Sequence, residues 1–283
     1  MPALILKPII MIPSIEINGR VIYPWYMLAA LVGILTALFF AYFLAKKRGY
    51  NEVTVFLTLL VGGAASLIGS HLLYGVVNYR LIITAVNNLD KLTSFKMLLD
   101  WLNEIFGGSV YYGGLITGMI GGWLYLRHEE KADRAPYVDM CAIALPLFHG
   151  FGRIGCFLGG CCYGVESACG FTYHYSQIAS ANGVSRFPVQ LVESGLNFLL
   201  FVLLWMLFRK GRAKGKLIWL YLLIYPVYRF ILEFFRGDTY RGFVGFLSTS
   251  QVVSILLFVF AAIMLIVKSR REQKAPKSLG AGA

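Results

Sequence analysis

Long apolar runs separated by short polar stretches recur along the 283-residue chain from one end to the other. A helix crosses the hydrocarbon of a bilayer in about 20 residues, because each residue adds ~1.5 Å of length. Most of the apolar runs approach or exceed that length, which predicts membrane-spanning helices. We expect seven spans, near Ile22–Ala45, Val53–Val77, Val110–Leu126, Tyr137–Gly152, Pro188–Phe208, Leu217–Phe235 and Gln251–Val267.

The fourth span is the weakest, because it is short and contains Pro146, His149 and Gly150. We expect this segment to enter only part of the membrane and to end in irregular backbone, which is tolerated where protein or water covers it.

Three segments outside the spans have compositions of their own. Residues 80–108 mix apolar and polar side chains, which predicts one or two helices lying along the outer interface. Residues 165–186 are polar and contain glycine, and we expect them to form a small outer segment. Residues 271–283 are basic and predict a disordered tail.

Composition agrees with this pattern: 58% of the residues are hydrophobic, 14% are charged, and the mean hydropathy is +0.68. We predict one all-α integral membrane domain over residues 1–283, in contact with the lipid bilayer. The net charge of +12 comes mostly from connections that would be cytoplasmic, with the amino terminus outside and the carboxyl terminus inside. Because topology accounts for this charge, we expect no nucleic-acid partner.

An arginine lies where lipid would be expected, in Gly152-Arg153-Ile154-Gly155 at the end of the fourth span. A guanidinium at the centre of a bilayer costs about 2.5–3.5 kcal/mol even on a lenient insertion scale, so Arg153 is a candidate functional residue. It needs an anionic partner, and a phosphate would satisfy it.

Two further motifs lie near the outer face in this topology. Tyr26 follows Trp25 at the start of the first span, and Tyr111-Tyr112-Gly113-Gly114-Leu115 begins the third. Alone, such aromatics are typical of the membrane interface, and paired glycines are typical of close helix approach. Their occurrence together with arginines at the same face makes a binding site the alternative.

The fifth span begins with Arg186-Phe187-Pro188-Val189-Gln190-Leu191-Val192-Glu193. Pro188 can open a helix, after which Gln190 and Glu193 share a face three residues apart. A solvated first turn and an anion-binding helix start both fit this pattern. Glu193 would enter the membrane within two turns, which is costly unless the carboxylate is paired.

The sixth span ends in a stripe of polar residues at helical spacing, Tyr225, Arg229, Glu233 and Arg236. A structural pair of Arg229 and Glu233 would explain part of the stripe. One carboxylate cannot neutralise both arginines, however, and the unmatched positive charge indicates a phosphate ligand.

Four of the five cysteines lie within fourteen positions: Cys141 stands apart from Cys156, Cys161, Cys162 and Cys169. A metal site is disfavoured, because neither C-x-x-C pairs nor closely spaced histidines accompany them. We favour the interpretation that these cysteines pack as buried small residues, and a disulfide is the alternative. We expect neither a metal nor a cofactor.

Taken together, Gly152–Gly155, Tyr111–Leu115, Arg186–Glu193 and Tyr228–Asp238 resemble the motifs of the prolipoprotein diacylglyceryl transferase family, in the family's order. The resemblance covers nearly the whole chain. It implies a transferase of the bacterial plasma membrane that moves a diacylglyceryl group from phosphatidylglycerol to the lipobox cysteine of a prolipoprotein. The products would be a thioether and glycerol phosphate, formed at a site toward the outer face.

The resemblance and the chemistry together suggest roles for the polar residues. We expect Arg153 and Arg229 to hold the phosphodiester, with Arg236 oriented by Glu233. Either Glu193 or Tyr112 would take or relay the thiol proton, and His149 is a weaker candidate. The remaining expected substrate-binding residues are Tyr26, Gly113, Gly114, Gln190, Tyr225 and His71.

The chain also departs from the commoner family pattern. It has Cys156, Gly159 and Cys161 where asparagines and a glutamate are common, and Tyr112 where a histidine is common. These departures leave the acceptor open, so a related transferase using another thiol or a hydroxyl is an alternative. Two other classes also stay open: a phospholipid-binding or translocating protein without bond cleavage, and a thiol oxidoreductase built on Cys161 and Cys162.

Overall fold

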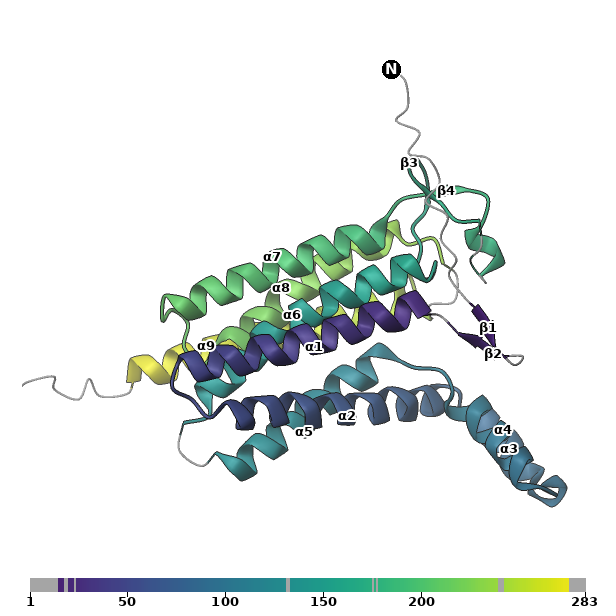
Figure 1. Cartoon of the computed structure of the whole chain (residues 1–283), viewed down its shortest axis with the longest axis horizontal. Coiled ribbons are helices and arrows are strands. Elements are labelled where there is room, and N and C mark those ends of the chain that lie inside the picture. Colours follow the sequence, from purple (N-terminus) through teal and green to yellow (C-terminus); the bar gives the residue numbers. More distant parts are fainter. Residues whose placement is uncertain are drawn as a thin grey trace, which may run out of the picture. The chain divides into compact units, whose positions relative to one another are not determined.

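Helices make up most of the computed structural model (Figure 1), which describes residues 15–17, 20–22, 24–130, 133–174, 176, 178–238 and 242–274. The chain divides into two compact units. The smaller unit is Ala41–Cys141, and the larger combines Met1–Phe40 with Ala142–Ala283. Helices α1 and α6 each contribute residues to both units.

Six helices among the described residues are long and apolar enough to cross a membrane. Their length and composition are those of an all-α protein with several membrane spans. They are α1 (Pro24–Lys47), α2 (Glu52–Val77), α6 (Ala135–Leu158), α7 (Val189–Arg209), α8 (Leu217–Leu232, extended by the 3₁₀ turn η3, Glu233–Phe235) and α9 (Thr249–Lys274).

The third predicted span forms helix α5 (Tyr111–Glu129), which is 19 residues long but is not among these six. Its glycines and tyrosines contribute less hydropathy than the aliphatic residues of the other helices. A seventh span and the direction in which the chain crosses the membrane therefore remain predictions.

Helix α6 differs from the expectation for the fourth span. It is 24 residues long, contains Pro146 and continues through Gly152 and Arg153 to Leu158. The prediction that this span ends in irregular backbone is therefore wrong. Glycine and proline are tolerated in membrane helices where neighbouring helices pack against them, and that is the case here.

Helix α6 lies at the centre of the larger unit, beside α1, α7 and α8 (Figure 1). A Cβ atom added to Gly33 of α1 would lie 2.8 Å from Phe151 Cβ, and one added to Gly150 would lie 2.6 Å from Phe198 Cε1 of α7. The missing side chains thus let the helices approach closely. A hydrogen bond of 2.9 Å joins Tyr221 Oη of α8 to Nδ1 of His149.

Helices α2 and α5 form the main contact of the smaller unit, again through glycines. A Cβ atom on Gly113 would lie 2.4 Å from Gly69 O, and one on Gly114 would lie 2.7 Å from Ser66 Oγ. The segment between the two helices contains α3 (Tyr79–Asn87), the 3₁₀ turn η1 (Leu89–Lys91) and α4 (Phe95–Phe106). Two short helices therefore lie within residues 80–108, for which one or two were predicted.

The strands within the described residues pair in three small antiparallel sheets: β1 (Ile15–Ile17) with β2 (Arg20–Ile22), β3 (Glu166–Thr172) with β4 (Ser185–Arg186), and β5 (Phe243–Val244) with β6 (Leu247–Ser248). The predicted outer segment contains β3, β4 and the 3₁₀ turn η2 (Ala179–Ala181). Tyr173 and Ala181 of this segment form a small hydrophobic cluster with Phe157 of α6 and Tyr163 of the loop after it.

The predicted tail is partly helical. Helix α9 continues to Lys274, so residues 271–274 are helical, contrary to the prediction of a disordered tail from residue 271. The rest of the predicted tail, 275–283, lies outside the described residues.

Candidate active site

An ion pair joins the last turns of α6 to the first turns of α7. Arg153 Nε lies 2.9 Å from Glu193 Oε1, and the Glu193 side chain is only 3% exposed. A carboxylate and a guanidinium buried at this depth are each costly alone, so each supplies the partner that the other requires.

The ion pair continues into α8 and beyond it. Arg229 Nη1 lies 3.7 Å from Glu193 Oε2, and Arg229 Nη2 lies 2.8 Å from Glu233 Oε2. Arg236 Nη1 is 3.7 Å from the same Glu233 oxygen, and Arg236 Nε donates to Asp238 Oδ1 at 2.9 Å. Positive and negative groups therefore alternate in a charged row that consists of Arg153, Glu193, Arg229, Glu233, Arg236 and Asp238.

This row corrects the expected surplus of positive charge. Glu193 and Asp238 supply the carboxylates that Glu233 alone could not, so three arginines face three acids. Burial disfavours the charge on Arg236, but the hydrogen bond to Asp238 and the negative charges of Cys162, Asp238 and Glu233 together outweigh burial and raise the pKa of Arg236 above its usual value. Its guanidinium therefore stays charged. A phosphate at this site would bind to neutralised arginines rather than to unmatched ones.

One donor in the row is nevertheless unused. Arg229 is 4% exposed, and in the described part of the chain its Nη1 has no hydrogen-bond acceptor within reach. The Glu193 oxygen at 3.7 Å is an ionic neighbour only. Nη2 of Arg229 is held by Ser250 Oγ at 3.2 Å. Leaving a buried donor unsatisfied costs about 1–3 kcal/mol, so this nitrogen offers a place for a ligand oxygen.

The predicted residues Gln190 and Tyr225 are buried near the row. Gln190 Nε2 donates to Cys161 O at 2.7 Å and to Tyr173 Oη at 3.2 Å. Burial raises the pKa of Tyr173, so its hydroxyl stays protonated. Gln190 thereby fastens the loop after α6 to α7. The centroid of the Tyr225 ring of α8 lies 5.3 Å from that of the His149 ring of α6, so the two rings meet where these helices pack together.

Tyr26 belongs to α1 and packs on α6. A Cβ atom added to Gly155 would lie 3.3 Å from Tyr26 Cδ2, so the ring lies over the helix two residues after Arg153. The side chain is 41% exposed. Its role in substrate binding stays a prediction.

The other predicted site residues belong to the smaller unit. Tyr112 is buried at the start of α5, and Gly113 and Gly114 form the close contact with α2. His71 Nδ1 lies 2.8 Å from both Phe106 O and Gly108 O. Because carbonyl oxygens only accept hydrogen bonds, Nδ1 carries a proton and donates it to them. His71 thus fastens the connection between α4 and α5.

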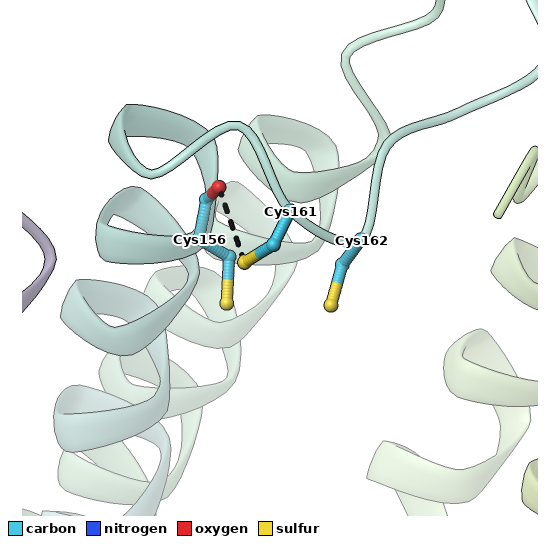
Figure 2. A group of neighbouring side chains, drawn as sticks. All are labelled: Cys156, Cys161 and Cys162. Atoms are coloured by element: carbon cyan, nitrogen blue, oxygen red, sulfur yellow. Dashed lines mark hydrogen bonds between the residues drawn. The ribbon is translucent and has the colours of Figure 1, made fainter. Parts of the chain in front are cut away.

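Three thiols converge where α6 ends (Figure 2). The Sγ atoms of Cys156, Cys161 and Cys162 all lie within 4.8 Å of one another. Hydrogen bonds from the other two thiols lower the pKa of Cys162, and the nearby guanidinium groups of Arg153 and Arg236 act in the same direction against burial. The three cysteines match no C-x-x-C pattern, and their spacing gave no sign that Cys162 joins the other two.

Sequence reasoning also missed Asp238 and Ser250. Asp238 follows Arg236 by two positions, and Arg236 has extended backbone (φ −84°, ψ 135°). Side chains two apart in extended chain share a face, so this spacing was an available signal. Ser250 comes from the start of α9, and no local pattern links it to Arg229.

Comparison with known proteins points in one direction. A family model described as prolipoprotein diacylglyceryl transferase matches residues 13–267. A protein named phosphatidylglycerol–prolipoprotein diacylglyceryl transferase from Clostridium tetani is 35% identical over 271 residues, covering 95% of this chain and all of the relative. Relatives of the same kind from Clostridium perfringens and Geobacter sulfurreducens are 32% and 30% identical, and cover 92% and 90% of the chain and 96% and 94% of their own lengths.

Proposed function

The chain belongs to the prolipoprotein diacylglyceryl transferase family, and we propose that its charged row catalyses transfer of a diacylglyceryl group from phosphatidylglycerol to the lipobox cysteine of a prolipoprotein. The curated relatives carry these two substrates in their names. The row is the part of this chain whose chemistry suits a phosphodiester.

The observation that carries this proposal is the unused donor of Arg229. Its Nη1 is buried and has no hydrogen-bond acceptor among the described residues, while its Nη2 is fixed by Ser250 and Glu233. A guanidinium held by one nitrogen presents the other at a defined place. An oxygen of the phosphodiester bound there would receive a charge-assisted hydrogen bond.

The reaction requires a sulfur nucleophile and a stabilised leaving group. The thiolate of the acceptor attacks the glycerol carbon bonded to the phosphate oxygen, the carbon–sulfur bond forms, and the carbon–oxygen bond breaks. Glycerol phosphate leaves with that electron pair, and the thiol proton goes to a base. Negative charge grows on the phosphate in the transition state, so hydrogen bonds from Arg153 and Arg229 would strengthen as the bond breaks.

Glu193 would act mainly by positioning the arginines. Its two oxygens lie beside different guanidinium groups, at 2.9 Å from Arg153 and 3.7 Å from Arg229. A carboxylate between two guanidinium groups holds both of them in place. Tyr112 of the smaller unit remains the other candidate for the thiol proton, and His149, bonded to Tyr221, is the weaker one.

We place the site toward the outer face of the bacterial plasma membrane. The last turns of α1 and α7 carry Lys46, Lys47 and Arg209, and basic residues are retained on the cytoplasmic side. Glu193 lies 16 residues before Arg209, which corresponds to about 24 Å of helix. The start of α7 would then lie near the opposite face, together with the start of α9 that holds Arg229 through Ser250.

The test is a transfer assay on the purified protein in nanodiscs that contain phosphatidylglycerol. A lipobox-cysteine peptide is added, the diacylglyceryl adduct is followed by mass spectrometry, and released glycerol phosphate is measured enzymatically. Arg229→Ala should lower both by about 10²–10³-fold, the usual cost of removing a single donor to a developing anion. Arg229→Lys should rescue little of the loss, since lysine cannot use two fixed nitrogens.

Arg209→Ala, at the other end of α7, is the matched control and should keep its rate. Glycerol phosphate without peptide modification would mean that the acceptor is another thiol or a hydroxyl. Full activity of Arg229→Ala would overturn the role proposed for the charged row. Neither product from the unaltered protein would overturn the transfer reaction and favour a protein that only binds or moves the lipid.

A further inference from the structure

The three thiols at the end of α6 have the geometry of a metal site. Zinc bound by cysteine has zinc–sulfur distances of about 2.3 Å, so sulfur atoms that share one ion lie roughly 3.8–4.0 Å apart. The Sγ atoms of Cys156, Cys161 and Cys162 already lie within 4.8 Å of one another. Small side-chain rotations would bring all three to a common ion. Figure 2 shows the three side chains drawn together from the last turns of α6 and the loop after it.

The backbone holds two of these thiols together. Gly160, with φ of +68°, donates its N–H to Phe157 O at 3.2 Å, and Cys161 donates its N–H to Cys156 O at 3.1 Å. These two bonds form a Schellman motif, which places the third residue before the helix end beside the second residue after it. Cys156 and Cys161 occupy those two positions.

The third thiol is added by an unusual conformation. Cys162 has φ of 54°, a left-handed value that costs a residue other than glycine roughly 1–2 kcal/mol. Adjacent side chains in ordinary extended backbone point in opposite directions. The left-handed residue instead lets consecutive cysteines both reach Cys156. The fold maintains this strained conformation at the point where three sulfur atoms meet.

We propose that Cys156, Cys161 and Cys162 bind one zinc ion as thiolates and leave its fourth position open. Zinc is favoured by soft sulfur ligands, and three protein ligands with one open position are typical of zinc sites that act on a substrate. Packing alone explains the contact of three small side chains but not the strained Cys162. A disulfide would use two of the sulfur atoms and leave the third unexplained.

The charges around the cluster suit such an ion. Zinc with three thiolates carries a net charge of −1. Arg153 Nη1 lies 3.9 Å from Cys156 Sγ, and Arg236 interacts electrostatically with Cys162. Two arginines of the charged row therefore face the thiol cluster as well. The cluster lies next to the groups that we propose bind the phosphodiester.

The role of the open position rests on the proposed transferase function. A thiol that binds zinc gives up its proton to solvent and remains as a thiolate, which is the nucleophile that the reaction requires. The sulfur then forms its bond to the glycerol carbon while the carbon–oxygen bond breaks and glycerol phosphate leaves. The product is a thioether, which is neutral and a weaker ligand, and it can leave the ion. The step is a substitution, so it requires neither an oxidant nor a reductant.

The metal site is tested on the full-length protein in nanodiscs without phosphatidylglycerol, so that no turnover occurs. After chelation, zinc is added back and counted by elemental mass spectrometry, and Co²⁺ is used as a spectroscopic substitute. We expect about one ion per chain and a sulfur-to-cobalt charge-transfer absorption. Zinc should also protect three thiols from alkylation. Two results would overturn the proposal. One is a disulfide among the three cysteines that is present in protein purified without reductant and that resists thiol exchange. The other is the absence of the charge-transfer absorption with Co²⁺.

Variants separate ligands from mere neighbours. Cys156→Ser, Cys161→Ser and Cys162→Gly should each lose the absorption, whereas Cys169→Ser and Cys141→Ser should keep it. Cys162→Gly is the sharpest of these, because glycine adopts the left-handed conformation without strain and the variant should fold at least as well. Its melting temperature checks this. Retained cobalt absorption in Cys162→Gly would exclude that residue as a ligand and overturn the three-thiolate site.

A lipobox peptide tests the open position. Adding the cysteine peptide to the cobalt-loaded protein should strengthen the charge-transfer absorption, and a serine analogue should leave it unchanged. If the ion binds but the cysteine peptide changes nothing, the substrate role is wrong. A parallel transfer assay with phosphatidylglycerol keeps the two proposals distinguishable. If the protein transfers the diacylglyceryl group but binds no zinc, the transferase proposal stands and the zinc site is wrong. If the protein binds zinc but transfers nothing, the zinc site stands and the transferase proposal is wrong.

Discussion

Glu193 Oε1 lies 2.9 Å from Arg153 Nε, across the contact between α7 and α6. The same carboxylate lies 3.7 Å from Arg229 of α8. One nearly inaccessible acid therefore connects three helices of the larger unit. Its charge serves the fold and the site together, because its removal would leave Arg153 without this carboxylate and Arg229 with Glu233 alone.

Glu193→Gln should accordingly lower both stability and activity. Breaking a buried ion pair by removing one partner costs about 3–5 kcal/mol, since the other partner is left buried and uncompensated. We expect a clear fall in melting temperature in nanodiscs and loss of transfer. Glu166→Gln, on exposed β3, is the control and should change neither. An unchanged melting temperature in Glu193→Gln would contradict the assigned role of this carboxylate.

Asp238 holds the far end of the charged row. Both its oxygens accept hydrogen bonds from Arg236, one of them from Nε at 2.9 Å, while the contact of Arg236 with Glu233 is longer, at 3.7 Å. Asp238→Asn keeps the shape but removes the charge and one acceptor. The rate of transfer should fall about tenfold, equivalent to ~1.4 kcal/mol in the barrier, measured as kcat with saturating lipid. Asp100→Asn on α4 is the control, and equal rates for both variants would remove Arg236 from the site.

Much of the fold could be predicted because burial in lipid is a local property of composition. A helix lies over each of the seven predicted spans, although only six are long and apolar enough to cross a membrane. The family, inferred from four motifs in order, is confirmed by the comparisons. Gly152–Gly155 was misplaced after a helix end because glycine and proline usually break helices in water. In α6 their small size serves packing against α1 and α7 instead.

The parts that could not be predicted depend on backbone turns and on distant contacts. Ser250 reaches Arg229 because α8 and α9 pack side by side, which no local pattern records. Cys162 joins the other thiols because of one left-handed residue, a conformation that cysteine rarely adopts. Gly159-Gly160 after α6 did signal a Schellman motif, and that motif alone would have paired Cys156 with Cys161.

A substitution at Gly113 tests whether the contact between α2 and α5 requires glycine. A Cβ atom there would lie 2.4 Å from Gly69 O and 2.6 Å from Leu73 Cβ, so the backbone must shift. Gly113→Ala should lower the free energy of unfolding by about 1–3 kcal/mol, the usual cost of overpacking. Gly63 of α2 has no atom within 4 Å of such a Cβ, and Gly63→Ala should be neutral or stabilising. Thermal unfolding of both variants makes the comparison, and equal melting temperatures would contradict the contact.

Arg186 lies in the outer segment, where its guanidinium contacts backbone carbonyl groups rather than the charged row. Nε donates to Ala181 O at 3.3 Å, Nη1 donates to Gly164 O at 3.4 Å, and the group lies 4.4 Å above the Tyr163 ring. Arg186→Lys keeps the positive charge but cannot make these separate bonds. The carbonyl groups of Ala181 and Gly164 would then lose their hydrogen-bond donors, and the outer segment should open locally more often.

Limited proteolysis between residues 163 and 187 measures that loosening. Arg186→Lys should be cut several-fold faster than the unaltered protein, because faster local opening follows from lost backbone hydrogen bonds. Arg212→Lys, exposed in the connection after α7, should be cut at the unaltered rate within this segment. Activity distinguishes the two possible roles of Arg186. Transfer lost together with faster cleavage agrees with a guanidinium that shapes the segment, whereas transfer lost at an unchanged cleavage rate would mean that Arg186 contacts the substrate.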